Sequence, residues 1–314
     1  MYKLKQKFSD FIVKEVFSPE IKKKGDYTYF ILEKENYNTM DAVKTIASKL
    51  RIPLSRFGFA GNKDKKAQTT QYISVKSLSD KKKEQLSGLK LKDIKIKIVG
   101  QSETPISLGD HSGNEFKIRI TNLTTEDKLK LKQKLKDKKK IQFIDSFGEQ
   151  RFGRNNVQVG KAILRREWEK ACKLVKNEDV NAHLKKHPKD FINALRKIPK
   201  KIISIYIHAY QSLIWNKCSE ILDVDKIPII GFSTEFKDKI TEHHVLGLMK
   251  KDKIELKSFI IREIPNLYLE GDERNKYAIA HNVRLIEEGK DYAILKFRLG
   301  TGSYATEFIR QLFE

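Results

Sequence analysis

Residues 56–75 read RFGFAGNKDKKAQTTQYISV, a short apolar run followed by a polar loop and a second apolar run. The loop, residues 61–66, holds a single carboxylate, Asp64, among three lysines. The second run, residues 72–75, is aromatic and β-branched, which is typical of a strand. The stretch therefore predicts two strands joined by a polar loop that presents one carboxylate.

Two more strands and a helix are predicted on the N-terminal side of this loop. Residues 11–13 and 27–32 are rich in aromatic and β-branched side chains, which favour strands. Thr39 is placed to cap a helix whose apolar residues fall on one face at helical spacing, and Pro53 closes that helix.

The sequence after the loop continues with strands and then turns helical. Residues 94–98 and 116–120 alternate apolar with polar side chains, which is the period of a half-exposed strand. Thr124 and Asp127 resemble a capping box at the start of a lysine-rich helix. From residue 157 to residue 222 the apolar period is helical.

The last third of the chain returns to strands. Residues 227–268 predict short strands and turns, residues 293–299 alternate like a strand, and a final helix is expected after Gly302. Strand-rich, then helix-rich, then strand again predicts an α+β domain that is interrupted by an insertion.

The net charge is the first indication of a partner. Lysine and arginine number 64 and aspartate and glutamate 41, which gives a formal net charge of +23. A chain this basic attracts phosphate backbones and gains affinity by releasing their counterions. The alternative is that lysine only solvates the surface.

Cysteine usage and hydropathy bear on the compartment. Cys172 and Cys218 match no metal-ligand spacing, so we expect reduced, buried thiols. No apolar run approaches the roughly 20 residues that span a bilayer, and the first residues lack the apolar block of a signal peptide. We therefore expect a cytoplasmic protein with no membrane partner.

Asp64 is the candidate catalytic group. Nearby cations favour the charged form of a carboxylate, so we expect Asp64 to be ionised at neutral pH. An ionised carboxylate beside cationic groups can act as a nucleophile or a base on a phosphodiester substrate. The alternative is a surface turn with a local ion pair, and the loop by itself leaves that alternative open.

Four segments in chain order resemble the TruD family of tRNA pseudouridine synthases, and they extend over nearly the whole chain. The loop and the residues after it, 61–71, resemble the signature G-x-K-D-[KR]-x-A-x-T-x-Q. The other three segments are residues 147–153 (FGEQRFG, similar to FGxQRFG), residues 209–216 (AYQSLIWN, similar to A-x-[QR]-S-x-x-[FW]-N) and residues 302–306 (GSYAT, similar to G-S-[YF]-A-T).

The resemblance implies an isomerase, an intramolecular transferase that converts uridine to pseudouridine. The C1′–N1 bond of the uridine breaks, the base turns, and it rejoins the sugar through C5. The aspartate matching Asp64 is that family's catalytic residue, and the chemistry needs no cofactor and no metal. The implied substrate is tRNA, most often uridine 13 of the D arm. The alternatives are a pseudouridine synthase for another RNA and a non-catalytic basic RNA-binding protein.

The resemblance also implies substrate-binding residues. A flipped base is held by stacking on an aromatic ring, and Phe147 matches the family's phenylalanine that packs against the target base. Lys5 stands where the family has a lysine near the catalytic carboxylate, and Arg151 can pair with a carboxylate or a phosphate. Three further positions of the first motif segment complete the set of expected substrate-binding residues: Asn62, Lys63 and Gln71.

Each of these assignments has a plainer alternative. Phe147 could be a core residue, Lys5 a solvated terminal lysine and Arg151 a member of a structural ion pair. Asp145 stands where the family usually has asparagine, two residues before Phe147. It is either a second carboxylate near the site, which would raise one of the two pKa values, or an isosteric acceptor.

We expect a pseudouridine-synthase-like catalytic domain with a mixed, mainly antiparallel sheet, built from residues 1–155 and 285–314. Residues 156–284 are expected to form an α/β insertion domain, the TRUD-type domain, which provides the other wall of an RNA cleft. Phosphate contacts position an RNA without reading it. We expect a monomer, and the basic residues of the insertion that could hold the RNA backbone are Lys185, Lys186, Lys189, Lys197, Lys200 and Lys201.

Overall fold

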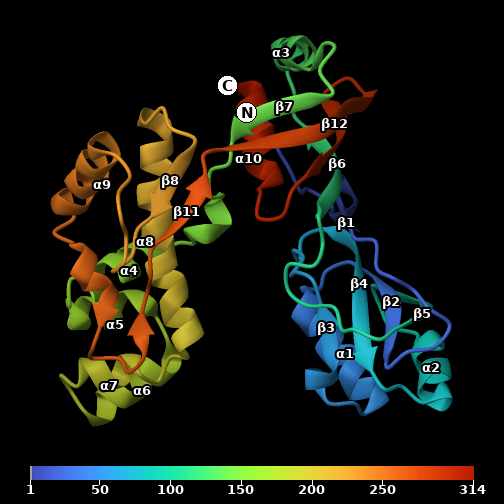
Figure 1. Ribbon diagram of the computed structural model, residues 1–314, viewed down its shortest axis with the longest axis horizontal. Coiled ribbons are helices and arrows are strands. Elements are labelled where there is room, and N and C mark those ends of the chain that lie inside the picture. The colour runs from blue at the N-terminus through green and yellow to red at the C-terminus, as the bar shows by residue number, and fades with distance from the viewer. Residues whose placement is uncertain (1) are drawn as a thin grey trace. The chain divides into compact units, whose positions relative to one another are not determined.

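The computed structural model describes residues 2–314, and the chain forms two compact units (Figure 1). Unit 1 contains the described residues up to Phe143 together with Ile279–Ala305 and Ile309–Glu314. Unit 2 contains Ile144–Ala278 and Thr306–Phe308. The chain therefore leaves unit 1, builds unit 2, and returns to finish unit 1.

A nine-stranded sheet organises unit 1, with the strand order β5-β2-β4-β1-β6-β13-β12-β7 and β3 paired to β4. β1 and β4 run parallel, whereas β2–β4, β2–β5, β1–β6, β6–β13 and β12–β13 are antiparallel. The predicted α+β class with a mixed, mainly antiparallel sheet is confirmed. The strands are β1 (Phe11–Val16), β2 (Tyr27–Lys34), β3 (Phe57–Phe59), β4 (Gln68–Lys76), β5 (Ile94–Ser102), β6 (Gly113–Thr121), β7 (Lys140–Ile144), β12 (Tyr277–Glu288) and β13 (Tyr292–Leu299).

Two helices, α1 (Thr39–Leu50) and α2 (Asp80–Ser87), cover the β2, β4 and β5 part of this sheet (Figure 1). The apolar face of α1 is buried against the inward side chains of β2 and β4, and Leu86 of α2 completes the same core. Burial of such a face supplies most of the stability of a helix in a protein.

The cap of α1 differs from the prediction by one residue. The Asn38 side chain accepts the bond from the Asp41 amide, so Asn38 and not Thr39 is the N-cap. Thr39 is fully buried, and its hydroxyl faces the loop that carries Asp64. Asn38 and Thr39 are both common capping residues. The contact of the Thr39 hydroxyl with the loop, which leaves the cap to Asn38, is not visible in the sequence.

The segment between β3 and β4, residues 60–67, is here called the Asp64 loop. Its two flanking strands pair antiparallel, with Phe57 opposite Val75 and Phe59 opposite Ile73. The start of β4 also pairs in parallel with β1, where Ile12 lies opposite Gln68. The loop is therefore anchored at one end of a strand that is paired on both sides.

The helix α3 (Thr125–Leu135) also belongs to unit 1, whereas the residues of α10 (Ala305–Phe313) are divided between unit 1 and unit 2. The predicted capping box of α3 is confirmed, because Thr124 accepts from the Asp127 amide and Asp127 accepts from the Thr124 amide. The predicted helix after Gly302 is α10.

Unit 2 is mainly helical and is built around α8 (Lys200–Ile221), whose buried residues include Tyr210 and Trp215. α4 (Asn156–Leu164) packs against α8 at Gly160. Two small sheets, β8–β11 and β9–β10, complete the unit. Its other elements are α5 (Trp168–Val175), α6 (Glu178–Lys186), α7 (Phe191–Leu195), α9 (Lys239–Lys251), β8 (Lys226–Ile229), β9 (Ile260–Ile261), β10 (Leu267–Tyr268) and β11 (Asp272–Asn275).

The prediction of only short strands and turns for residues 227–268 is wrong in one place. Residues 239–251 form the helix α9, capped by the Asp238 side chain at the Thr241 amide. Thr241, Val245 and Met249 are buried at a spacing of four residues. Gly247 and the β-branched residues have low helix propensity, but the cap and the buried face outweigh it.

The structure also bears on membrane-spanning segments and on the two cysteines. Among residues 2–314, no helix combines the length and the apolar character needed to span a membrane. Cys172 and Cys218 are free and buried, and burial raises the pKa of each thiol to about 11.

Two helical glycines should respond in opposite directions to alanine. At Gly160 a Cβ atom would lie 2.2 Å from the Tyr206 carbonyl oxygen, so Gly160→Ala should lower the free energy of unfolding by about 1–3 kcal/mol through overpacking. At Gly247 a Cβ atom meets nothing within 4 Å, so Gly247→Ala should raise it by about 0.5–1 kcal/mol. Urea unfolding of both variants measures the difference, and two changes of the same sign would contradict this packing.

Candidate active site

Asp64 and Lys5 lie together although 59 residues separate them in sequence. Lys5 Nζ is 2.7 Å from Asp64 Oδ2. The Asp64 side chain is 37% exposed, whereas that of Lys5 is 18% exposed, and the ammonium of Lys5 also lies 4.1 Å from the centre of the Phe11 ring. Asp64 is therefore a solvent-accessible carboxylate with one fixed cationic partner.

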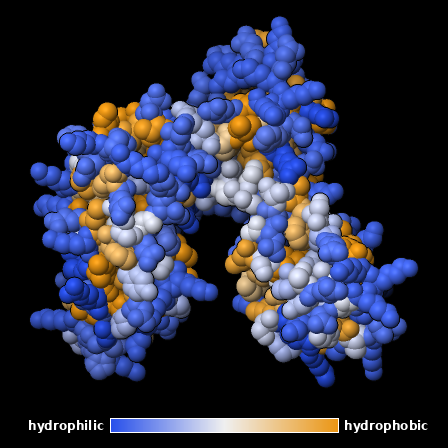
Figure 2. Space-filling model, viewed as in Figure 1, coloured by the Kyte–Doolittle hydropathy of each residue, from blue (hydrophilic) through white to orange (hydrophobic). Residues whose placement is uncertain are grey.

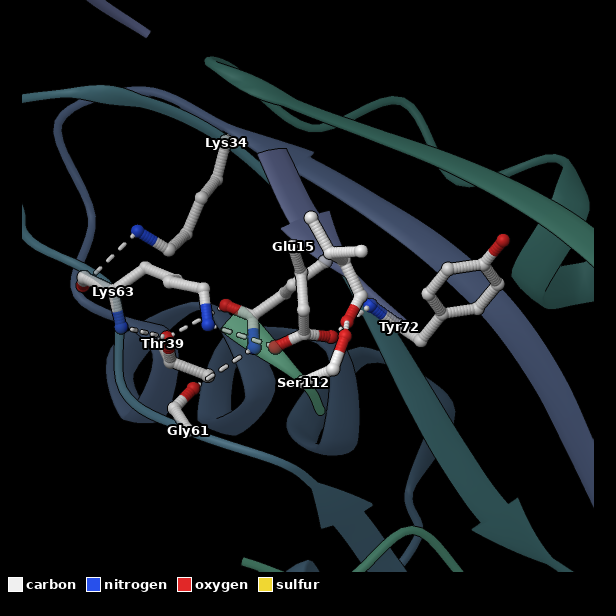
Figure 3. Close-up of polar contacts among 9 residues, drawn as sticks. Glu15, Lys34, Thr39, Gly61, Lys63, Tyr72 and Ser112 are labelled. Atoms are coloured by element: carbon white, nitrogen blue, oxygen red, sulfur yellow. Dashed lines mark hydrogen bonds and ion pairs between the residues drawn. The ribbon is translucent and has the colours of Figure 1, made fainter. Parts of the chain in front are cut away.

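The residue before Asp64 points the other way, into the unit. Lys63 Nζ is 2.7 Å from Glu15 Oε1, and the two side chains are 5% and 0% exposed (Figure 3). Glu15 Oε2 also accepts a hydrogen bond of 3.1 Å from the Tyr72 amide. A buried ion pair needs such additional bonds to offset the loss of hydration, and this one ties the Asp64 loop to β1 and β4.

Gln71 and Thr39 hold the start of the loop. The Lys63 amide donates to Thr39 Oγ1 at 2.8 Å, and Thr39 Oγ1 donates to Gln71 Oε1 at 2.7 Å. Gln71 Nε2 donates to the Gly61 carbonyl at 3.1 Å. Gln71 is 1% exposed and both ends of its amide are bonded to protein, so its contacts are those of a residue that supports the loop.

His111 comes from the segment between β5 and β6 and lies against the same loop. A Cβ atom at Gly61 would come within 3.1 Å of His111 Cε1, so the imidazole approaches the loop backbone closely. Burial lowers the pKa of His111, and the ammonium of Lys63 lowers it further. The neutral imidazole is thus favoured beside the Lys63–Glu15 pair.

Lys34 at the end of β2 is a site residue that the sequence did not reveal. It is 3% exposed, and Lys34 Nζ donates to the carbonyl oxygens of Tyr37, Lys63 and Asp64 at 2.6, 3.3 and 3.2 Å. Burial lowers the pKa of Lys34 to about 8, while Asp64 opposes the decrease and Lys63 adds to it. No spacing in the sequence connects a strand-end lysine to a loop 30 residues later.

Phe147 and Arg151 belong to unit 2, whereas Asp64, Lys5, Asn62, Lys63 and Gln71 belong to unit 1. Phe147 is 6% exposed, and its ring packs edge-on against Trp215 with ring centres 5.5 Å apart. The guanidinium of Arg274 lies 4.5 Å from the ring centre, and that of Arg151 lies 5.4 Å away. Arg151 Nε also donates to Ser212 Oγ at 3.2 Å.

Asn216 of the third motif holds the backbone at Phe147. Asn216 Oδ1 accepts from the Phe147 amide at 2.9 Å, and Asn216 Nδ2 donates to the Phe147 carbonyl at 3.0 Å. Asn216 thus acts as a scaffold group for the backbone at Phe147. The second and third motifs, which are far apart in sequence, therefore meet in unit 2.

Asp145 is paired within unit 2. Its Oδ2 is 2.6 Å from Arg274 Nη2, and its carbonyl accepts two further hydrogen bonds from the same guanidinium. The pair places Arg274 over the Phe147 ring, so Asp145 contributes to the packing around Phe147.

The exposure of Asn62 and the spacing of potential metal ligands complete the description of the site. Asn62 is exposed at the surface of the Asp64 loop. Over residues 2–314, no three His, Cys, Asp or Glu side chains gather in a way that could hold a metal ion.

Comparison with known proteins gives the family. The model of the family "tRNA pseudouridine synthase D (TruD)" matches residues 2–181, 173–222 and 224–312. The tRNA pseudouridine synthase D of Aquifex aeolicus is 29% identical, with 99% of this chain and 98% of the relative covered. A crystal structure described as a tRNA pseudouridine synthase D (TruD) from Methanosarcina mazei superposes with a TM-score of 0.74 at 25% identity, covering 99% of this chain and 93% of that one.

The chain therefore belongs to the TruD family of tRNA pseudouridine synthases. The family that the four segments predicted is confirmed, and the match extends over nearly the whole chain.

The buried ion pair should be the largest single contribution to the stability of the Asp64 loop. Lys63→Met leaves Glu15 buried without its cation, so the free energy of unfolding should fall by about 3–5 kcal/mol. Urea unfolding at pH 7 measures the change. Lys65→Met is the matched control because Lys65 is exposed on the same loop, and its effect should stay within about 0.5 kcal/mol.

Adding Glu15→Gln to Lys63→Met removes the uncompensated charge. The double variant should recover part of the lost stability. A loss below about 1 kcal/mol for Lys63→Met alone would show that the pair is not essential to the fold.

Proposed function

We propose that this protein isomerises uridine to pseudouridine in tRNA and that Asp64 is the catalytic carboxylate. Membership of the TruD family supports the reaction class. The observation that carries the assignment of Asp64 is its geometry: a solvent-accessible carboxylate 2.7 Å from a lysine, on a loop whose backbone and Lys63 side chain are held by buried groups.

The chemistry can be balanced without a cofactor. The C1′–N1 bond of the uridine breaks, the uracil turns within the site, and a C1′–C5 bond forms. The proton lost from C5 leaves, and N1 gains one, so substrate and product are isomers. Asp64 has three routes open to it: attack at C1′, attack at C6, or removal of a sugar proton.

Lys5 is proposed to fix the direction of the Asp64 carboxylate. A charge-assisted bond of 2.7 Å between Nζ and Oδ2 leaves Oδ1 directed away from the lysine. Lys5 itself is restrained by its contact with the Phe11 ring. Asn62, two residues before Asp64, is exposed. It is proposed to contact the nucleotide.

Lys63 and Gln71 are proposed to act on the substrate through the loop. These two residues are 7% and 1% exposed and their side chains are bonded to protein groups, so they set the loop conformation that presents Asp64 and Asn62. Phe147 is proposed to contact the target base, and Arg151 to assist it from the same unit. Because Phe147 is 6% exposed, that contact uses the small accessible part of the ring.

We propose the domain assignment in the same way: a catalytic domain from residues 1–155 and 285–314, and an insertion of residues 156–284 that holds RNA. Hydrophilic residues cover most of the face drawn in Figure 2. A surface hollow of about 470 Å³ in unit 2 is lined by Lys186, Lys197, His183 and His187, with Asp179 and Ala182. Cations in such a hollow suit a phosphate backbone.

The six lysines of the insertion named from the sequence are available for that role. Within the part of the chain that is described, none of them is in an ion pair, whereas Lys170 and Lys173 on α5 are paired with Glu167 and Glu169. The substrate is proposed to be tRNA recognised by its shape, and uridine 13 of the D arm is the proposed target. The protein is proposed to act as a monomer in the cytoplasm.

Asp64→Asn tests the catalytic assignment. The variant keeps the shape of the side chain and removes its charge, so the rate of pseudouridine formation should fall by on the order of 10³-fold or more. Chemical labelling of pseudouridine in unmodified tRNA gives the rate, and filter binding gives the affinity, which should change little. Asp80→Asn, at an exposed carboxylate on α2, should be as fast as the wild type.

The outcomes separate the alternatives. Product from tRNA with uridine 13 but none from tRNA with cytidine 13 supports the proposed position, whereas product from both assigns another uridine. If the wild type binds tRNA but forms no pseudouridine, the protein is a non-catalytic RNA-binding protein. An Asp64→Asn variant that keeps the wild-type rate removes Asp64 from the mechanism.

A charge variant of unit 2 tests the proposed RNA contact. Lys186→Met with Lys197→Met should weaken tRNA binding and should reduce the slope of log K against log salt by about 1–2, because two counterion-releasing contacts are lost. The double variant Lys170→Met and Lys173→Met is the control and should leave the slope unchanged. Equal slopes for both double variants would place the RNA elsewhere.

A further inference from the structure

Lys34 is buried without a carboxylate partner. It is 3% exposed, and in the described chain, residues 2–314, it forms no ion pair with a side chain. Its three partners are backbone carbonyl oxygens. Burying a charge costs free energy unless it is paired or well bonded. An apolar side chain would fill this space at a lower cost in free energy, so a role in filling space does not explain a lysine here.

The number of partners matches the protonated amine. An ammonium group has three N–H donors and no acceptor, and Lys34 Nζ has three carbonyl oxygens around it at 2.6–3.3 Å. A neutral amine has two donors and a lone pair, so one carbonyl would face that lone pair. The arrangement is therefore complete only while Lys34 carries its proton.

Two of the three carbonyls belong to consecutive residues of the Asp64 loop. Lys34 holds the carbonyl of Lys63 and the carbonyl of Asp64, which fixes the peptide between them. The third carbonyl is that of Tyr37, just before the N-cap of α1. Lys34 thus joins the loop to the same segment that supplies Thr39, and it fixes the backbone from which the Asp64 side chain projects.

We propose that Lys34 is a positioning residue for the uridine isomerisation, whose protonated amine holds the Asp64 loop in its reactive conformation. The proposal rests on the proposed function, because Asp64 is taken as the catalytic carboxylate. Lys34 itself touches neither substrate nor a reacting atom.

The groups around Lys34 set the pH at which it loses its proton. Burial lowers the pKa of Lys34 to about 8, Asp64 opposes the decrease and Lys63 adds to it. The other charged or titratable groups near the loop are Glu15, paired with Lys63, Lys5, paired with Asp64, and His111, which lies against Gly61. Lys34 therefore loses its proton near pH 8 in the folded protein, whereas an ordinary lysine keeps it to about pH 10.5.

Rate and stability should then respond to pH in opposite directions. Above pH 8 the neutral amine turns a lone pair toward one of the three carbonyl oxygens, so the peptide between Lys63 and Asp64 is no longer fixed and the rate constant falls. Between about pH 8 and pH 10.5 the unfolded chain binds more protons at this residue than the folded chain does, so the contribution of Lys34 to the free energy of unfolding rises with pH. A residue with a merely structural role would not make activity fall while stability rises.

The experiment measures single-turnover rate constants on saturating tRNA from pH 6 to pH 10 for the wild type, Lys34→Arg and Lys34→Met. The wild-type rate should fall as pH rises through about 8. Lys34→Arg keeps its charge at every pH used, so its rate should show no fall near pH 8. Lys34→Met should be slow by roughly 10–100-fold at all pH values, with the tRNA dissociation constant within about twofold of the wild type.

Lys65→Met is the matched control, because Lys65 is an exposed lysine of the same loop and should keep the wild-type profile. Hydrogen exchange of residues 60–67 gives a readout that does not depend on product. Protection at pH 7 should be lower in Lys34→Met than in the wild type and should be close to the wild-type value in Lys34→Arg.

The results are decisive in either direction. Protection at pH 7 that is equal in the wild type and in Lys34→Met overturns the proposal. If Lys34→Met fails to fold, the pH profile of the Lys34→Arg rate decides. A fall of the rate near pH 8 that persists in Lys34→Arg also overturns it. Absence of product from the wild type sinks the proposed function, while the exchange data still decide whether Lys34 holds the loop.

Discussion

The buried ion pair between Lys63 and Glu15 is the interaction on which the rest of the site depends. It ties the Asp64 loop to β1, and its carboxylate also holds the backbone of β4 through the Tyr72 amide. Lys63 is buried in this pair, whereas the next residue, Asp64, is 37% exposed, so the pair fixes the backbone from which Asp64 projects. The cation of Lys34 completes the arrangement from the other side of the loop backbone. A loop held in this way loses little conformational freedom when a nucleotide binds, which favours catalysis by a pre-positioned group.

The residues proposed for the site come from both units. Unit 1 carries Asp64 and Lys5 with the buried cations that support them, whereas unit 2 carries Phe147, whose ring packs with Trp215 and Arg274. Lysines of unit 2 without ion pairs supply the positive charge that a long-range attraction to RNA requires. Affinity and catalysis are thus assigned to different residues, so each can be altered without the other.

Most of the fold, and Asp64 as the candidate catalytic residue, could be predicted from the sequence, but the groups that hold the Asp64 loop could not. Alternating strands, helical periodicity and the capping box at Thr124 are local signals, and the structure has each of them. Lys5 was found only through the family resemblance, since a terminal lysine has no local signal. Lys34, Glu15 and Thr39 act through contacts with residues 24–57 positions away, which no local pattern encodes. The helix α9 was missed because its cap and buried face outweigh a low intrinsic propensity.

A crystal structure of the protein bound to a tRNA whose target uridine cannot react would test the central claim most directly. We predict that one uridine is turned out of its stack. A carboxylate oxygen of Asp64 should then lie about 3–3.5 Å from C1′, from C6, or from a sugar carbon that carries the proton to be removed. We also predict that Lys5 remains bonded to the other oxygen and that Lys63 and Lys34 keep their partners. A bound tRNA with no uridine near Asp64, or with the Asp64 loop detached from Glu15, would contradict the central claim.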